Sequence, residues 1–149
     1  MSTLTASGVR TVEIEKSVHV RRSAEDTFRL FVDEMGKWWP VHTGKYTYDA
    51  ARAQDVFLEP HVGGRFYERY KDGEEFTIGQ VLKFDRPTHV LFTWAAGFET
   101  ATEVEVRFTP EGDGTRVDLQ HRAAESVPLL GHGFENGWDE VLGYFVAAA

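Results

Sequence analysis

The titratable side chain best placed for chemistry in this sequence is His121. It shares the parity of Val117 and Leu119 in an alternating run, so on a regular strand it points toward the core. A neutral imidazole in that position would hydrogen-bond a ligand or act as a general base. The simpler interpretation is a buried histidine whose ring nitrogens are satisfied by the protein, and the sequence leaves both open.

Polar side chains on two other expected strands raise the same question. Gln80 shares the parity of Ile78, so it should face inward, as either a structural bridge or a hydrogen-bonding group for a ligand. Arg65 and Tyr67 share one parity of their strand and are candidate electrophilic helpers for His121. Because both parities of that strand contain an aromatic residue, the pattern does not determine which set faces inward.

Aromatic residues make up 13% of the chain and are spread along its length. Concave apolar walls with a few polar groups are typical of small-molecule sites. A single phenylalanine is more often part of the core, whereas a buried tryptophan needs an acceptor for its indole N–H, so four tryptophans favour a cavity with water or ligand acceptors. Together with Gln80 and His121, the expected ligand-binding residues are Trp38, Trp39, Phe57, Phe66, Phe76, Phe92, Trp94, Phe134 and Trp138.

Three common kinds of site lack support in the sequence. The remaining histidines never fall in an HxH, HxxxH or HExxH spacing, and the chain has no cysteine, so we expect no metal ion and no disulfide. No serine lies in a GxSxG elbow. Neither Gly63-Gly64 nor Gly131-His132-Gly133 has the form of a phosphate-binding loop, and we expect no cofactor.

Length and charge limit the class of protein. The 149 residues fit one domain spanning residues 1–149, with the first ten residues frayed. The net charge of -8 argues against binding nucleic acid or an anionic membrane, because both depend on clustered Lys and Arg. The sequence has neither the apolar stretch of a signal peptide nor a run long enough to span a membrane, which favours a cytoplasmic location.

The longest periodic stretch covers residues 133–146. Phe134, Trp138, Val141 and Phe145 recur at i, i+4, i+7 and i+11, which aligns them on one face of a helix. No other stretch predicts a helix of similar length, whereas the middle of the chain predicts a series of short strands. We therefore expect the helix to lie across a curved antiparallel sheet, with the site in the space between them.

The remaining elements follow from alternation and turn residues. Strands are expected over residues 11–20, 54–59, 64–70, 75–84, 90–95, 102–109 and 115–122, and the row Glu103, Glu105 and Arg107 is expected to be a solvated sheet face. Ser23, with Asp26 three residues later, predicts the start of a helix over residues 24–32. A second short helical piece ends at Pro40, and the long connection 41–53 is the expected gate of the site.

Several motifs, in this order and spacing, resemble those of the SRPBCC superfamily, and more narrowly the group named for the C-terminal domain of the activator of heat-shock-protein-ninety ATPase. They are Phe31-Val32-Asp33, Lys37-Trp38-Trp39-Pro40, residues 59–68, Gly79-Gln80-Val81-Leu82 followed by Asp85-Arg86-Pro87, Leu91-Phe92-Thr93-Trp94, residues 102–108, Gly112-Asp113-Gly114-Thr115 and Gly137-Trp138. The resemblance implies an α+β helix-grip fold, in which a curved seven-stranded antiparallel sheet wraps around a long C-terminal helix, with two short helices after the first strand. It also implies a ligand-binding habit but no shared catalytic motif.

Three functions remain open from the sequence. The first is non-enzymatic binding of a small hydrophobic or aromatic molecule between the sheet and the last helix. The second, drawn from superfamily relatives, is an enzyme of the cyclase, dehydratase or hydrolase kind with His121 as base and Tyr67 or Arg65 as helper. The third, ranked last, is a protein-interaction module like the co-chaperone domain, with a chaperone as partner. A homodimer is compatible with each.

Overall fold

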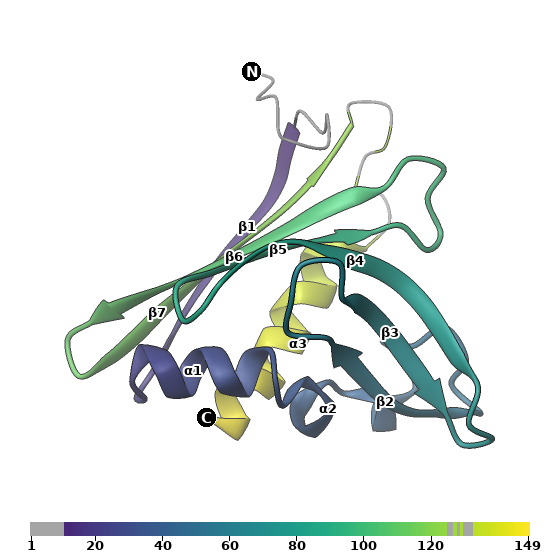
Figure 1. Cartoon of the computed structure of the whole chain (residues 1–149), viewed down its shortest axis with the longest axis horizontal. Helices are drawn as coiled ribbons and strands as arrows, with labels where there is room; N and C mark the ends of the chain where they lie inside the picture. The colour runs from purple at the N-terminus through teal and green to yellow at the C-terminus, as the bar shows by residue number, and fades with distance from the viewer. Residues whose placement is uncertain (1–10, 125–126, 128, 130–132) are drawn as a thin grey trace.

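The computed structural model describes residues 11–124, 127, 129 and 133–149, and shows one curved antiparallel sheet closed around a C-terminal helix (Figure 1). The seven strands follow the order β1-β7-β6-β5-β4-β3-β2. The expectations for residues 1–10, and for Gly131 and His132, fall outside the described residues. The expected α+β helix-grip fold is confirmed.

The elements begin and end within two residues of the expected positions. The strands are β1 (Thr11–Val20), β2 (Ala53–Leu58), β3 (Arg65–Tyr70), β4 (Glu75–Asp85), β5 (His89–Trp94), β6 (Thr102–Glu111) and β7 (Gly114–Ala123). The helices are α1 (Ala24–Phe31), α2 (Met35–Trp38) and α3 (Phe134–Ala148), and a 3-10 turn, η1 (Val41–Thr43), opens the connection to β2. Ser23 caps α1 as its position predicts, because its hydroxyl oxygen accepts from the Asp26 N–H at 3.1 Å.

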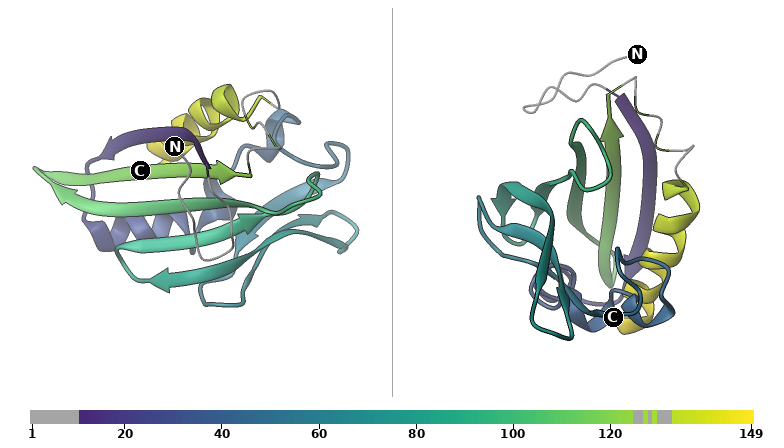
Figure 2. Two further views of the ribbon diagram at one scale, coloured as in Figure 1. Left: turned by 90° about the horizontal axis from the view of Figure 1, so that it is seen from above. Right: turned by 90° about the vertical axis from the view of Figure 1, so that its right-hand side faces the viewer.

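Helix α3 lies inside the curve of the sheet, while α1 and α2 close the same side further along (Figures 1 and 2). Of its predicted face, Trp138, Val141 and Phe145 are at most 3% exposed and Phe134 is half-buried; Leu142 joins the buried set. Full burial of one such side chain stabilises the fold by roughly 1.5–3 kcal/mol. The sheet and this helix therefore form a single core.

One end of the space enclosed by the sheet is filled by packed aromatic rings. Phe31 contacts Trp38, Phe108 and Phe145 at ring-centroid distances of 5.1, 5.7 and 5.2 Å, and Phe28 contacts Phe108 at 5.0 Å. Edge-to-face contacts of this kind add to the stabilisation from burial. Any cavity must therefore lie toward the other end of α3, near Trp138.

A bulge in β4 overturns the expected orientation of Gln80. Phe66 pairs with Gly79 and Tyr67 with Thr77, so Ile78 is an extra residue and the parity changes after it. Gln80 pairs with Arg65 and is exposed on the outer face of the sheet. The expectation that Gln80 faces inward is wrong, because simple alternation does not include a bulge.

The same pairing decides which side of β3 faces inward. Glu68 is 1% exposed and shares the inner face with the fully buried Phe66. The Arg65 guanidinium lies over the Tyr67 ring, 4.1 Å from its centroid. The Tyr67 ring packs on the Phe57 ring of β2 at a centroid distance of 5.4 Å. Arg65, Tyr67 and Phe57 therefore lie on the outer face, away from the space enclosed by the sheet.

The outer row of β6 is less solvated than expected. Glu103 is fully buried and Glu105 is 9% exposed. Arg122 of β7 donates to Glu105 at 2.7 Å and to Glu103 at 3.4 Å, and His89 lies 2.5 Å from the second Glu105 oxygen. Despite its burial, the Glu105 carboxyl has a pKa below its usual value, because its hydrogen bonds to Arg122 and His89 favour the carboxylate. Glu103 and Glu105 therefore belong to a buried ion network, whereas Arg107, the third residue of the row, is exposed as expected.

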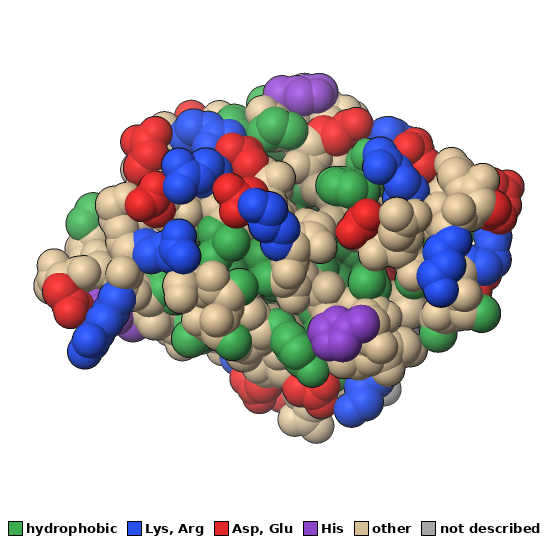
Figure 3. All heavy atoms as spheres, turned by 90° about the horizontal axis from the view of Figure 1, so that it is seen from below, with side chains coloured by type: hydrophobic (Ala, Val, Ile, Leu, Met, Phe, Trp, Pro, Cys, Tyr) green, Lys and Arg blue, Asp and Glu red, His purple; other side chains and the backbone are tan. Residues whose placement is uncertain are grey.

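The face at the bottom of Figure 1 carries no large patch of side chains with a single sign of charge. Figure 3 shows Lys and Arg side chains intermingled with Asp and Glu there, around scattered hydrophobic side chains. Such a surface offers no continuous basic track for a phosphate backbone. None of the helices in the described part of the chain is long and apolar enough to cross a membrane.

The close approach of β4 and β5 beside the bulge at Ile78 can be tested by substituting two glycines, one at this approach and one on α3. A Cβ on Gly79 would stand 1.7 Å from the Thr93 carbonyl oxygen, whereas a Cβ on Gly143 in α3 would meet nothing within 4 Å. We expect Gly79→Ala to lower the free energy of unfolding by roughly 1–3 kcal/mol through overpacking. We expect Gly143→Ala to raise it by roughly 0.5–1 kcal/mol through helix propensity. Urea denaturation followed by circular dichroism measures both, and equal midpoints for the two variants would contradict the β4–β5 geometry.

Candidate functional site

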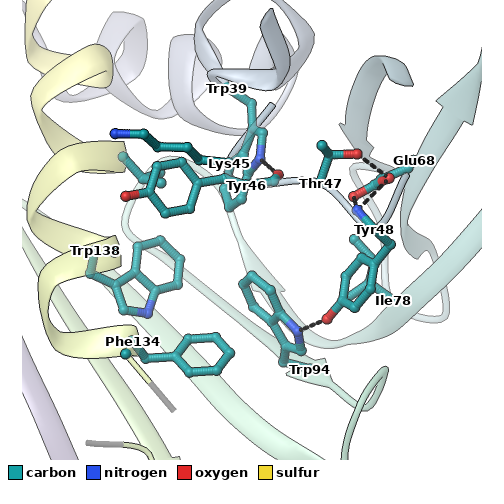
Figure 4. A pocket seen from close by; sticks show the side chains of 13 residues that line it. Trp39, Lys45, Tyr46, Thr47, Tyr48, Glu68, Ile78, Trp94, Phe134 and Trp138 are labelled. Carbon is teal, nitrogen blue, oxygen red and sulfur yellow. Dashed lines mark hydrogen bonds between the residues drawn. The ribbon is translucent and has the colours of Figure 1, made fainter. Parts of the chain in front are cut away.

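A pocket of about 190 Å³ opens between α3 and the sheet, beside the filled aromatic end (Figure 4). Its walls come from α3, from strands β3, β4 and β5, and from a short segment of the connection after η1, here called the strap (residues 45–48). The lining residues are Trp39, Lys45, Tyr46, Thr47, Tyr48, Glu68, Ile78, Trp94, Gly133, Phe134, Gly137, Trp138 and Val141.

Three tryptophans form the apolar walls. Trp39 lies 6.2 Å from Trp94 and 6.1 Å from Trp138, and Trp94 lies 6.0 Å from Trp138, measured between ring centroids. Phe134 meets Trp94 edge-on at 5.2 Å. The rings are thus held at angles to one another around the space, which suits a flat ligand that contacts ring faces and edges.

The indole N–H groups all have acceptors within the protein, contrary to the expectation from the sequence that water or a ligand would accept from them. Trp38 donates to the Leu30 carbonyl at 2.8 Å and Trp39 to the Tyr46 carbonyl at 2.9 Å. Trp94 donates to the Tyr48 hydroxyl at 2.7 Å, and Trp138 to His121. All four donors are satisfied by the protein.

The strap is attached to the sheet at two places. The Tyr48 hydroxyl accepts from Trp94 and donates to the Ala96 carbonyl at 3.0 Å. The Thr47 hydroxyl donates to Glu68 at 2.8 Å, and the Tyr48 N–H donates to the same carboxylate at 2.9 Å. These contacts place two aromatic side chains of a segment without regular structure over the pocket.

The strap also contacts α3 on the other side of the pocket. Lys45 lies 3.7 Å from the Glu140 carboxylate, and the Tyr46 hydroxyl is hydrogen-bonded to Glu140. Burial and this acidic neighbour raise the pKa of Tyr46, so it stays a neutral phenol. The strap therefore bridges helix and sheet.

Glu68 is the charged group in the pocket wall that stands out. Burial raises the pKa of its carboxyl, against the opposing effect of donors on Thr47, Tyr48 and Tyr70. In the described part of the chain, no Lys, Arg or His nitrogen lies within 4 Å of it. The pocket thus contains a carboxyl group whose charge the protein solvates with hydrogen bonds alone.

His121 is fully buried and belongs to a chain of hydrogen bonds that leaves neither ring nitrogen free. Trp138 donates to Nδ1 at 3.0 Å, which places the imidazole proton on Nε2. Nε2 is 2.8 Å from the Thr102 hydroxyl, whose own proton goes to the Trp94 carbonyl at 2.9 Å. Burial, with a smaller effect of Arg122, lowers the pKa of His121 to about 3.

This arrangement decides between the two roles expected for His121. A general base needs a free nitrogen facing substrate and a pKa near the working pH. His121 has neither, and Arg65 and Tyr67, its expected helpers, lie on the other face of the sheet. The catalytic arrangement built on His121 is therefore wrong, and its structural role is to connect α3 to β6 and β7.

The structure brings together four of the expected ligand-binding residues, Trp39, Trp94, Phe134 and Trp138. Trp38, Phe66, Phe92 and His121 are buried but do not line the pocket, and Phe57 and Gln80 lie on the outer face. Phe76 is 37% exposed and packs behind Tyr48 at 5.0 Å. The strap lies within the connection 41–53 that the sequence analysis expects to be the gate, but sequence reasoning named neither its lining residues nor Glu68; two tyrosines in an otherwise polar connection were the available signal.

A curved sheet closed around a C-terminal helix, with a pocket between them, defines a helix-grip protein of the SRPBCC kind. The chain belongs to the Activator of Hsp90 ATPase homolog 1-like family, whose model matches residues 21–149. No curated protein matches the sequence. The resemblance derived from the sequence is confirmed.

Solved structures give the same fold. Protein MLL2253 from Mesorhizobium loti is 15% identical, with a TM-score of 0.63, over 90% of this chain and 93% of that one. The Aha1 dimer from Colwellia psychrerythraea is 19% identical, with a TM-score of 0.62, over 89% and 91%. Txn09, described as an anthrahydroquino-γ-pyrone synthase, is 30% identical, with a TM-score of 0.50, over 74% and 75%. The first two similarities show the fold alone.

The hydrogen-bond chain through His121 predicts a pH dependence of stability. The folded protein keeps this imidazole neutral down to about pH 3, whereas the unfolded chain protonates it near its ordinary pKa of 6.5. The free energy of unfolding should therefore be unaffected by this group above about pH 6.5 and fall below it, by at most about 1.4 kcal/mol per pH unit.

NMR measures this directly. Between pH 8 and 5 the ¹⁵N shifts of His121 should remain those of the neutral Nε2–H tautomer, while an exposed histidine such as His61 serves as the internal control. His121→Asn should remove this group's part of the stability loss between pH 6.5 and 5. An imidazole that titrates near 6.5 in the folded protein would refute the hydrogen-bond chain.

Proposed function

We propose that the protein binds a small, flat, hydrophobic or aromatic molecule in the pocket between α3 and the sheet, without transforming it. The observation that carries the proposal is the aromatic wall of Trp39, Trp94 and Trp138 around an open space. Because the indole N–H groups are already engaged, these side chains present mainly carbon surface to a ligand. Removing apolar ligand surface from water would provide most of the affinity.

Binding should be visible through the tryptophans themselves. We expect 1-naphthalenemethanol to quench the intrinsic fluorescence and to raise the melting temperature, by the equivalent of about 2.7 kcal/mol at a hundredfold excess over the dissociation constant. Calorimetric titration and thermal melting measure the two effects.

Two positions on α3 provide a matched pair of variants. Gly137 lines the pocket, and Gly143 lies on the open side of the same helix. Gly137→Leu places a side chain in the ligand's space and should weaken binding roughly tenfold or more, whereas Gly143→Leu should leave it unchanged. Equal affinities for the two variants would place the binding site elsewhere.

A second candidate function is catalysis on an aromatic polyketide-like substrate in the same pocket. It is favoured by the 30% identity with Txn09, described as an anthrahydroquino-γ-pyrone synthase. In this chain Glu68, rather than His121, would be the acid–base group, because it lines the pocket and its raised pKa brings it closer to neutrality.

The two candidates differ in turnover. If the protein is an enzyme of this kind, incubation with the substrate of that synthase should yield a pyrone product detectable by mass spectrometry, and Glu68→Gln should abolish product while the substrate still binds. Binding without product would exclude this reaction and leave the first proposal.

Assembly and location remain predictions. The Aha1 structure from Colwellia psychrerythraea is described as a dimer, which supports a homodimer for this chain. The single domain over residues 1–149, the cytoplasmic location and the low rank given to a chaperone partner rest on the sequence.

A further inference from the structure

The pocket combines an uncompensated carboxyl group with aromatic walls. Glu68 is 1% exposed and lines the pocket. A buried carboxylate normally has a cationic partner, because removing its charge from water is costly. Glu68 instead receives hydrogen bonds from neutral donors on Thr47, Tyr48 and Tyr70. The Tyr48 N–H is shared between the two carboxylate oxygens, at 3.1 and 2.9 Å, so a charged donor could replace one of these two shared contacts.

Nearby cations are occupied elsewhere. Arg52, whose guanidinium lies over the Tyr70 ring, is paired with Asp49, Asp72 and Glu74. Asp49 adds negative charge on the same side and itself contributes to raising the pKa of Glu68.

Two further basic side chains are also engaged. Lys45, at the pocket wall, is paired with Glu140 at 3.7 Å. Arg69 lies over Phe57 on the outer face of the sheet. Within the described residues, the protein itself supplies no positive charge to the Glu68 carboxyl.

The walls around this carboxyl group are of the kind that stabilises a cation. Trp39, Tyr46, Tyr48, Trp94 and Trp138 line the same space. Aromatic faces attract ammonium groups through their quadrupole, and most strongly where water is excluded. An aromatic enclosure that also holds a carboxylate therefore favours a ligand with a positive charge.

We propose that the pocket selects a flat aromatic molecule that carries a protonated amine, with the amine directed to Glu68 and the rings held among the tryptophans. The inference rests on the proposed binding function and adds the chemical class of the ligand. The amine donates a hydrogen bond to a carboxylate oxygen that otherwise shares the Tyr48 N–H, and it supplies the positive charge that the described residues do not provide. Tyr48 holds the strap in place and forms part of the wall around that amine.

Three probes of nearly equal shape test the charge preference. They are 1-naphthylmethylamine, 1-naphthalenemethanol and 1-naphthoate, which at pH 7 carry charges of about +1, 0 and -1. In calorimetric titrations of the wild-type protein we expect the amine to bind about tenfold more tightly than the alcohol, from the charge-assisted hydrogen bond and the ring faces together. The naphthoate should bind most weakly.

Two substitutions locate the source of the preference. Glu68→Gln keeps an oxygen acceptor for Thr47 and Tyr48 but removes the charge, so the amine should lose its advantage while the alcohol binds as before. Asp139→Asn removes one negative charge from the exposed side of α3, outside the pocket lining, and should leave the preference intact.

The outcomes separate this inference from the function on which it rests. If the alcohol binds as tightly as the amine, or the naphthoate binds best, the charge preference is refuted while aromatic binding stands. If none of the three probes binds, both fail. If Glu68→Gln does not fold, the comparison of the three probes on the wild-type protein still decides.

Discussion

The contact on which the rest of the structure depends is the one between the apolar face of α3 and the inner surface of the curved sheet. At the C-terminal end of the helix, Phe145 packs against Phe31 and Trp38 and the space is closed. Toward its N-terminal end, Trp138 is fixed by its hydrogen bond to His121 instead of by dense packing alone. Because a hydrogen bond fixes direction as well as distance, the indole keeps its position beside a cavity that none of the described side chains fills.

This division explains why His121 resembles a catalytic residue in the sequence but is not one in the structure. An inward polar residue must find partners or pay a desolvation cost. The partners of His121 are Trp138 on α3 and Thr102 on β6, and the Thr102 hydroxyl in turn donates a hydrogen bond to the Trp94 backbone carbonyl. The same bonds that orient two walls of the pocket consume both nitrogens that catalysis would need.

The fold was predictable because its signals are periodic and local. The i, i+4, i+7 spacing of α3, the alternation of Val104 and Val106, and the Ser23 cap each depend on nearby residues. The orientation of Gln80 was not predictable from the sequence. A one-residue bulge at Ile78 changes which side chains of β4 face inward, and the residue types around it do not reveal the bulge. Likewise the burial of Glu103 arises from a partner, Arg122, that lies on another strand.

Part of the pocket was predictable, because the helix and strands that carry its tryptophans have periodic, local sequence signals. Trp39, Trp94 and Trp138 are conspicuous residue types, and the expected helix and strands brought them to one side. Tyr46 and Tyr48 lie in a segment without a period, and only long-range contacts to Glu140 and Glu68 decide where they point. The sequence indicated that the connection 41–53 covers the site, but not which of its side chains line the pocket.

The strap joins parts of the fold that are otherwise separate across the cavity: Glu140 on the helix, Glu68 on one strand and the Ala96 carbonyl beyond another. Under the proposed binding function, a ligand that entered beneath the strap would have to break several of these contacts at once, so its association and dissociation would share one activation barrier. Substitutions within residues 45–48 would then change both rates without altering the sheet.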